Sequence, residues 1–177
     1  MTRGWPRLSA AALVLVLAVL TAGCGGGEDT AAPTKIELLP NDLLPASMAG
    51  LRVDAEDIEE TVKGGKRQSY LESAGLYSFR TDDDLLQATL QVSRFDEKAR
   101  FTDNDFRQSV LLQIGSTVPR SFRMSDQTVY LSTGRRQNVV IWFKGEYLFV
   151  LSTREEFGRP RSLLREAIDL ELEEKLT

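Results

Sequence analysis

The part of the sequence that most constrains the fold is a series of four β-type stretches between Ser121 and Ser152: SFRMS, TVYLS, QNVVIWF and YLFVLS. Short turns at 126–127, 133–136 and 144–145 separate them, a spacing typical of an antiparallel meander. The last two stretches are apolar on both faces, as the run Val139, Val140, Ile141, Trp142 and Phe143 shows. We therefore expect them to be central strands that other elements cover on both sides.

Two runs upstream predict a β-hairpin. Residues 75–81 and 86–95 flank three consecutive aspartates at 82–84, which favour a turn. In the second run apolar residues alternate with polar ones, and the polar set is Gln87, Thr89, Gln91 and Ser93. This period of two predicts a strand with one face toward solvent.

Two further segments predict helices. In Thr102–Ile114, an apolar residue recurs every four positions, and Thr102 with Asp105 forms a start similar to a capping box. Near the end of the chain, Pro160 is well placed as a first helical residue. The leucines and isoleucine that follow it form one apolar stripe, made of Leu163, Leu164, Ala167, Ile168, Leu170 and Leu172. We expect this stripe to cover one face of the sheet.

Together these elements predict an α+β fold in a single domain over residues 36–177, mainly an antiparallel sheet with a mid-chain helix and a C-terminal helix packed on it. Residues 38–45, which contain two prolines, are expected to be an irregular lead-in. The order of elements over residues 50–175 resembles the Mog1/PsbP-like fold, an antiparallel sheet flanked by helices. The resemblance implies an architecture and no activity.

The N-terminus is typical of a secretory signal peptide over residues 1–23. Arg3 and Arg7 precede the uncharged run Ala10–Leu20, and small residues follow it. Eleven residues of helix span about 17 Å, well short of the ~30 Å hydrocarbon core of a bilayer. The alternative is an uncleaved membrane anchor.

The only cysteine of the chain, Cys24, follows this run directly. The stretch Leu20-Thr-Ala-Gly-Cys24 resembles a bacterial lipobox. This resemblance implies that the sulfur of Cys24 receives a diacylglyceryl group and that cleavage falls between Gly23 and Cys24. A thiolate is a strong nucleophile, which suits it to alkylation by a lipid donor. The alternative is a chance free cysteine, a liability in an exported protein.

Residues 24–35 are expected to form a lipidated, flexible tether, because three glycines and several polar residues follow Cys24. About eleven such residues have a root-mean-square reach of roughly 17–20 Å. We therefore expect the domain to lie near the outer, extracytoplasmic face of the cell membrane, held by its lipid anchor.

Composition and charge exclude several functions. The chain contains no histidine, which removes the usual general base and metal ligand. The whole chain carries −4, and removal of Arg3 and Arg7 leaves −6, so nucleic-acid binding is not expected. Nine cations and four acids lie in residues 119–165, an excess suited to anionic headgroups or wall polymers, or else scattered over a solvated surface.

No motif for catalysis or cofactor binding is present, and we expect neither an enzyme nor a cofactor. The sequence has no G-x-S-x-G or S-x-x-K pattern and no phosphate loop. Residues 82–84 and 103–105 carry oxygen ligands but do not form an EF-hand, so we expect a turn and a helix cap and no metal site.

The remaining candidate for recognition is a surface around Trp142, Arg135 and Arg136. Trp142 on a central strand is expected in the core; alternatively, its ring reaches a groove beside the arginines and binds a ligand by stacking. The sequence thus favours a membrane-anchored envelope lipoprotein that acts as a binding or adaptor module for an envelope protein, an anionic polymer or a small ligand. The alternatives are an envelope hydrolase that uses carboxylates only, and a structural or regulatory lipoprotein without a soluble ligand.

Overall fold

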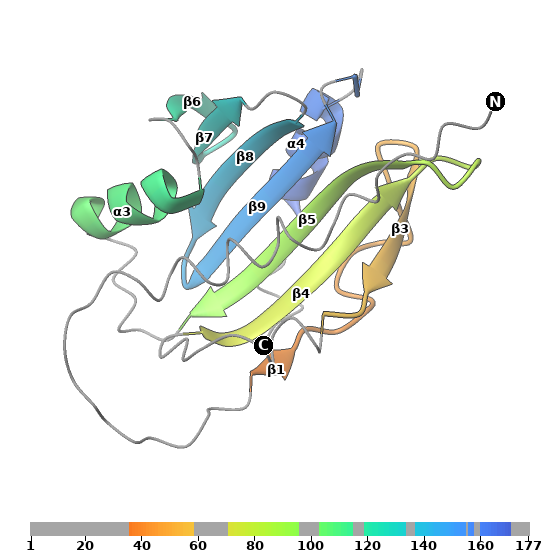
Figure 1. The fold of residues 1–177 in the computed structure, drawn as a ribbon, viewed down its shortest axis with the longest axis horizontal. Coiled ribbons are helices and arrows are strands. Elements are labelled where there is room, and N and C mark those ends of the chain that lie inside the picture. The colour runs from red at the N-terminus through yellow and green to blue at the C-terminus, as the bar shows by residue number, and fades with distance from the viewer. Residues whose placement is uncertain are drawn as a thin grey trace.

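A computed structural model of the chain describes residues 36–58, 71–95, 103–114, 119–133, 137–154, 156–157 and 160–170. These residues form one nine-stranded sheet and two helices, an α+β fold in one domain, as predicted (Figure 1). The predicted signal peptide, Cys24 and the tether lie outside the described residues. The elements are β1 (Glu37–Leu38), β2 (Ser47–Met48), β3 (Leu51–Glu56), β4 (Leu71–Arg80), β5 (Leu86–Phe95), α3 (Asn104–Ile114), β6 (Arg120–Met124), β7 (Gln127–Thr133), β8 (Gln137–Lys144), β9 (Tyr147–Arg154) and α4 (Pro160–Asp169).

The sheet joins two antiparallel units through one non-sequential pairing. The strand order is β2-β3-β4-β5-β9-β8-β7-β6, and β1 pairs with β4 in parallel. The predicted hairpin is confirmed as β4–β5, and the predicted meander is confirmed as β6–β9. The contact between β5 and β9 places β8 and β9 in the interior of the sheet, where their apolar composition is needed.

The two helices cover opposite faces of the sheet, so both faces have a core. The buried leucines of α4 pack with Phe79, Leu90 and Trp142, a cluster that we call the α4-side core. Val110 and Leu111 of α3 pack with Ile141 and Phe143, which we call the α3-side core. The prediction that the last two strands are covered on both sides is therefore confirmed.

The first turn of α3 shows how the chain starts this helix. Asp103 lies just before the first helical residue, and its Oδ1 accepts a hydrogen bond of 2.9 Å from the backbone N–H of Asp105. A side-chain oxygen in this position satisfies a backbone donor that has no partner within the helix. The predicted cap residue, Thr102, lies outside the described residues.

The prediction that β5 exposes one face to solvent is wrong for Gln91 and Ser93, whereas Gln87 and Thr89 of the same polar set are half-buried. Gln91 and Ser93 are 4% and 1% exposed, and the side-chain amide of Gln91 donates a hydrogen bond of 3.0 Å to Ser93 Oγ. This part of the face of β5 is therefore buried, and the two polar side chains satisfy each other inside the protein.

The predicted lead-in contributes more structure than its prolines indicate. Residues 37–38 and 47–48 form β1 and β2, and Leu39, Leu43 and Leu44 between them are buried in the α4-side core. Two of these leucines follow Pro40 closely, in a turn closed by the hydrogen bond from Leu43 N to the Pro40 carbonyl oxygen. The lead-in thus covers part of the sheet beside α4.

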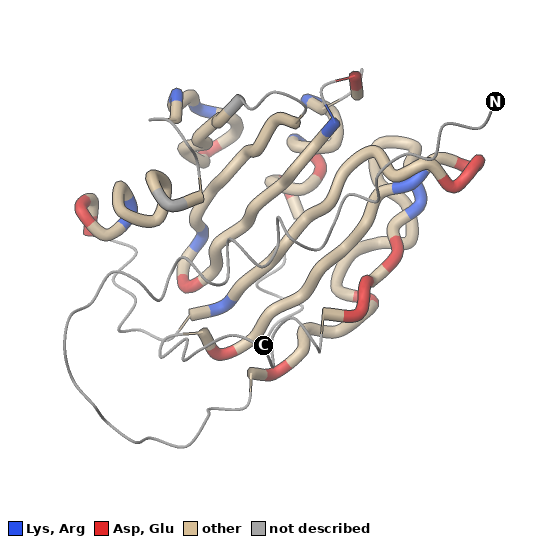
Figure 2. The backbone as a smooth tube through the Cα atoms, in the orientation of Figure 1, with Lys and Arg blue, Asp and Glu red and all other residues tan. Residues whose placement is uncertain are grey.

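Charge is unevenly placed over the fold (Figure 2). Acidic residues lie along β1 and β3, at one edge of the sheet, and arginines lie on β6, at the other edge, and on α4. No helix among the described residues is long and apolar enough to cross a membrane.

Candidate functional site

A fork at the edge of β4 is the candidate site. β1 ends opposite β4 at the pair Leu38–Ala74, and β3 ends opposite β4 at the pair Glu56–Leu76. The two strands run in opposite directions and reach β4 on either side of Gly75. Neither can continue along β4 without colliding with the other, so both must leave the sheet at this point.

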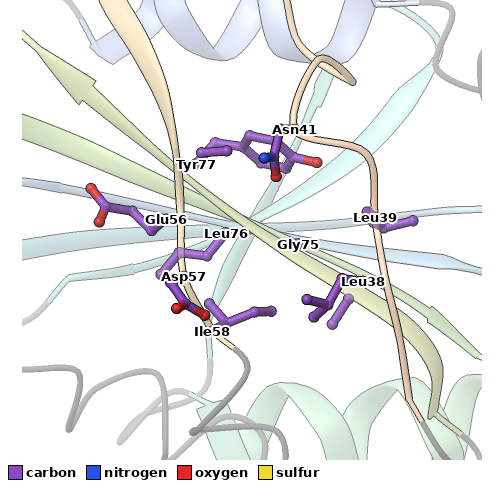
Figure 3. Close-up of a pocket in the computed structure, with 11 residues that line it drawn as sticks. Leu38, Leu39, Asn41, Glu56, Asp57, Ile58, Gly75, Leu76 and Tyr77 are labelled. Carbon is purple, nitrogen blue, oxygen red and sulfur yellow. The ribbon is translucent and has the colours of Figure 1, made fainter.

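The segments that follow β1 and β3 leave the sheet toward its opposite faces, and a cleft opens between them. After β1, Leu39 turns into the α4-side core, whereas after β3, Ile58 enters the α3-side core. The cleft has a volume of about 330 Å³, at the lower end of the range for small-molecule sites (Figure 3).

The cleft has an apolar interior and a polar rim (Figure 3). The apolar lining consists of Leu38, Leu39, Ala55, Ile58, Ala74, Gly75 and Leu76. Leu38 is 46% exposed, an unusual value for a leucine within a strand, and it lies at the cleft. Polar groups come from Asn41, Glu56, Asp57 and Tyr77. This combination suits a ligand with an apolar part and a polar group near the rim.

Tyr77 and Gly75 determine the shape of the cleft on the α4 side. The Tyr77 hydroxyl donates a hydrogen bond of 2.8 Å to the backbone carbonyl of Pro40, which fixes the lead-in against β4. The ring can reach that position only because residue 75 lacks a side chain: a Cβ there would lie 2.8 Å from Tyr77 Oη and 3.1 Å from Leu39 Cβ. Burial, and next the negative charge of Asp42, raise the pKa of Tyr77 above its ordinary value, so the phenol is a neutral donor.

The rim of the cleft is acidic. Glu56 and Asp57 line it directly, and Glu37 and Asp42 lie on the adjacent segments. Glu56 Oε1 accepts a hydrogen bond of 3.1 Å from Arg80 Nη2, which offsets one of these charges. Carboxylates gathered at the rim favour a ligand that carries a cationic or hydrogen-bond-donating group.

A network of ion pairs lies beyond the cleft, around the turn at 82–84. Arg52 Nη2 lies 2.6 Å from Asp84 Oδ1, and Arg52 Nε lies 3.0 Å from Asp54 Oδ2. Arg80 also contacts Asp54 and Asp84, at 3.8 and 4.0 Å. Asp84, in this turn, thus forms ion pairs with two arginines. Within the described ranges, no three His, Cys, Asp or Glu side chains converge on a point that could hold a metal ion.

The predicted recognition surface around Trp142 requires a correction. Trp142 is 1% exposed and stacks on Phe149, with ring centroids 4.9 Å apart, inside the α4-side core. Its side chain faces the layer covered by α4, so the expectation that Trp142 lies in the core is confirmed and the alternative, that its ring stacks on a ligand, is wrong. Arg135 and Arg136 lie outside the described residues, as does Cys24.

Sequence reasoning missed Asn41, Gly75 and Tyr77. One signal was available: a glycine inside an apolar strand often marks a close approach of another chain segment. Gly75 within the run GLYSF is such a case. The approaching segment, however, is about 35 residues away in the sequence, and no local pattern identifies it.

Comparisons with protein families, with curated proteins and with solved structures find no match for this chain. The resemblance to the Mog1/PsbP-like fold stays a prediction from the order of the elements.

Proposed function

We propose that this protein is a lipid-anchored binding module on the extracytoplasmic face of a bacterial cell membrane. In this proposal, residues 1–23 direct export, Cys24 carries the lipid, and residues 25–35 tether the folded domain. Two acyl chains hold a protein stably at a bilayer, whereas one holds it only marginally. The diacylglyceryl group on a single sulfur supplies two.

The observation that carries the proposal is the position of Cys24 between a basic and then apolar N-terminal segment and the folded domain. The apolar run ends four residues before Cys24, and the described fold begins at Ile36, twelve residues after it. The sulfur is therefore close enough to the domain to hold it at the membrane and far enough from it to be modified before folding interferes.

The cleft at the fork supplies the binding function. It combines an exposed apolar wall at Leu38 with an acidic rim, and it lies at the same edge of the sheet as the start of the domain. Anchoring confines the module to a thin layer above the membrane, so that a modest intrinsic affinity is sufficient for recognition of a partner held in the same layer.

The anchor is tested by metabolic labelling with palmitate in a bacterial host. The native chain should incorporate label and remain with membranes after an alkaline carbonate wash, and Cys24→Ser should do neither. Thr30→Ser, a matched change to serine six residues downstream, should behave as the native chain does. Equal labelling of the native chain and Cys24→Ser would refute the anchor.

The cleft is tested by titration of the isotopically labelled protein with hexylammonium and with hexanoate. Because the rim is acidic and the wall apolar, hexylammonium should shift the backbone amide signals of Leu38, Gly75 and Leu76, and hexanoate should not. Leu38→Asn, which leaves the charge of the rim unchanged but removes the apolar wall, should weaken the response. Identical responses to the two probes would contradict the assigned ligand class.

A further inference from the structure

One end of the sheet carries a group of arginines that the cleft does not use. Arg120 begins β6 and pairs with Leu131 near the end of β7, and Arg154 ends β9 and pairs with Gln137 at the start of β8. These residues lie at the end of the sheet where β7 connects to β8. A turn closed by the bond from Phe157 N to the Arg154 carbonyl oxygen contains an exposed acid, Glu156, and leads into α4, which begins with Pro160. We call Arg120, Arg154, Arg161 and Arg165 the basic end.

Three arginines of the central and acidic part of the sheet have carboxylate partners among the described residues, whereas Arg120, Arg161 and Arg165, and also Arg107 and Arg123, have none. Arg52, Arg80 and Arg94 each form at least two ion pairs. Arg120, Arg161 and Arg165 are exposed and form no ion pair with any other described residue. The positive charges of Arg120, Arg161 and Arg165 are therefore available to an external anion.

The two arginines of α4 lie on the flank that faces β6. At 100° per residue, Arg161 and Arg165 are about 40° apart on the helix surface. Glu166 lies about 100–140° from both and accepts a hydrogen bond from the backbone N–H of Ala49, at the β2–β3 turn. Asp169, about 40° from Arg165, accepts a hydrogen bond from Ser125 in the β6–β7 turn. Arg161 and Arg165 thus lie on the side of α4 that is away from β3.

An exposed aromatic side chain lies on the same face of the sheet. Phe122 pairs directly with Val129, whose side chain is in the α4-side core, so Phe122 also points toward the α4 side. It is 38% exposed, two residues from Arg120. Aromatic rings beside cationic groups are enriched where proteins meet the interfacial region of a membrane.

Protection against aggregation explains only part of this surface. Arginines on an unpaired edge strand such as β6 discourage pairing with other chains. Arg161 and Arg165 are on a helix, where no strand edge needs protection. Their unpaired charges, on the flank that faces β6, need another explanation.

We infer that the basic end lies against the anionic lipid headgroups of the membrane that holds the anchor. This inference rests on the proposed function for the presence of the membrane. Figure 2 shows that the opposite edge of the sheet, along β1 and β3, is acidic, and an anionic membrane repels it. The domain is therefore oriented with its cleft pointing away from the bilayer, toward its ligand.

The tether permits this orientation. From β1 to β6 there are six strand spacings, which amount to about 29 Å at ~4.8 Å each. The twelve residue-to-residue steps from Cys24 to Ile36 extend to about 40 Å at most and reach roughly 17–21 Å on average. The start of the domain can thus be held some 29 Å above the headgroups while the lipid of Cys24 stays in the bilayer.

The inference is tested with the chain from residue 24 onward carrying Cys24→Ser, so that headgroup binding is measured without the lipid. Sedimentation with vesicles of phosphatidylglycerol and phosphatidylcholine at low salt should exceed sedimentation with pure phosphatidylcholine. Each basic residue near an anionic surface strengthens binding by about a factor of five, so Arg161→Gln with Arg165→Gln should weaken it by roughly 25-fold. The control, Arg94→Gln with Lys144→Gln, removes the same charge at the other end of the sheet and should weaken binding less than about threefold.

Several outcomes would overturn the inference. These are no preference for phosphatidylglycerol vesicles, equal losses in the two double variants, or binding to soluble polyphosphate in place of vesicles. Thermal unfolding of each variant verifies that it is folded. Vesicle sedimentation is measured without the lipid, whereas palmitate labelling reports only the lipid on Cys24. A negative result in the first experiment can therefore be told apart from a negative result in the second.

Discussion

Replacement of Gly75 by alanine tests the packing that shapes the cleft. Alanine is ordinarily favoured over glycine within a strand by about 0.5–1 kcal/mol, because it loses less backbone entropy on folding. At residue 75, however, the new Cβ would lie 2.8 Å from Tyr77 Oη, 3.0 Å from Tyr77 Cε2 and 3.1 Å from Leu39 Cβ. Overpacking of this kind costs about 1–3 kcal/mol. We therefore expect Gly75→Ala to lower the free energy of unfolding by about 1–2 kcal/mol.

A double-mutant cycle with Tyr77→Phe identifies the cause. The closest of the three contacts involves the Tyr77 hydroxyl, which also donates the hydrogen bond to Pro40. Tyr77→Phe alone should cost about 1 kcal/mol through loss of this bond. In the Tyr77→Phe background the 2.8 Å contact is absent, so Gly75→Ala should cost less, with a coupling of about 0.5–1 kcal/mol.

Urea unfolding provides the measurement. Trp142 is the only tryptophan after residue 23 and is 1% exposed, so its fluorescence reports loss of the core. The four proteins of the cycle are compared at one pH and temperature. If Gly75→Ala stabilises the protein, or if the two changes are additive, the explanation of the cleft from Gly75 and Tyr77 is refuted.

Two further predictions concern buried polar groups. The pKa of Tyr77 is raised above its ordinary value of 10.0, first by burial and then by the negative charge of Asp42. The stability that the neutral phenol contributes is therefore complete below pH 10.0 and declines as the pH rises toward the pKa of the folded state. The decline is at most about 1.4 kcal/mol per pH unit. Between about pH 9 and about pH 11 the native chain should lose stability relative to Tyr77→Phe, and parallel curves would contradict this. Ser93→Ala should cost about 1–3 kcal/mol because it leaves the Gln91 amide without its partner at 3.0 Å, whereas Gln91→Leu combined with Ser93→Ala should cost clearly less. Urea unfolding distinguishes the two cases, and a double variant no more stable than Ser93→Ala would disprove the role of the bond.

The elements that the sequence predicted correctly are those with a local pattern. The continuous apolar runs of β8 and β9 and the apolar stripe of α4 reflect which side chains face a covering layer, and the local pattern reports this directly. The turn at 82–84 follows from aspartates that favour tight turns. Boundaries were also close: the predicted helix start at Thr102 lies two residues before Asn104.

Features set by contacts between distant segments could not be predicted in this way. The parallel pairing of β1 with β4 and the burial of Leu39, Leu43 and Leu44 depend on a meeting of segments about 35 residues apart. The polar side chains of Gln91 and Ser93 follow the pattern of an exposed face, and only the packing of the rest of the chain on this face of the sheet buries them. The cleft arises because the segments after β1 and β3 diverge, and the sequence of either segment alone does not indicate this.

Mass spectrometry of the N-terminal peptide of the protein, purified from bacterial membranes, tests the central claim most directly. The account expects a peptide that begins at Cys24 and carries a diacylglyceryl group on its sulfur. A peptide that still contains residues before Cys24, or a Cys24 whose thiol carries no lipid, would contradict it.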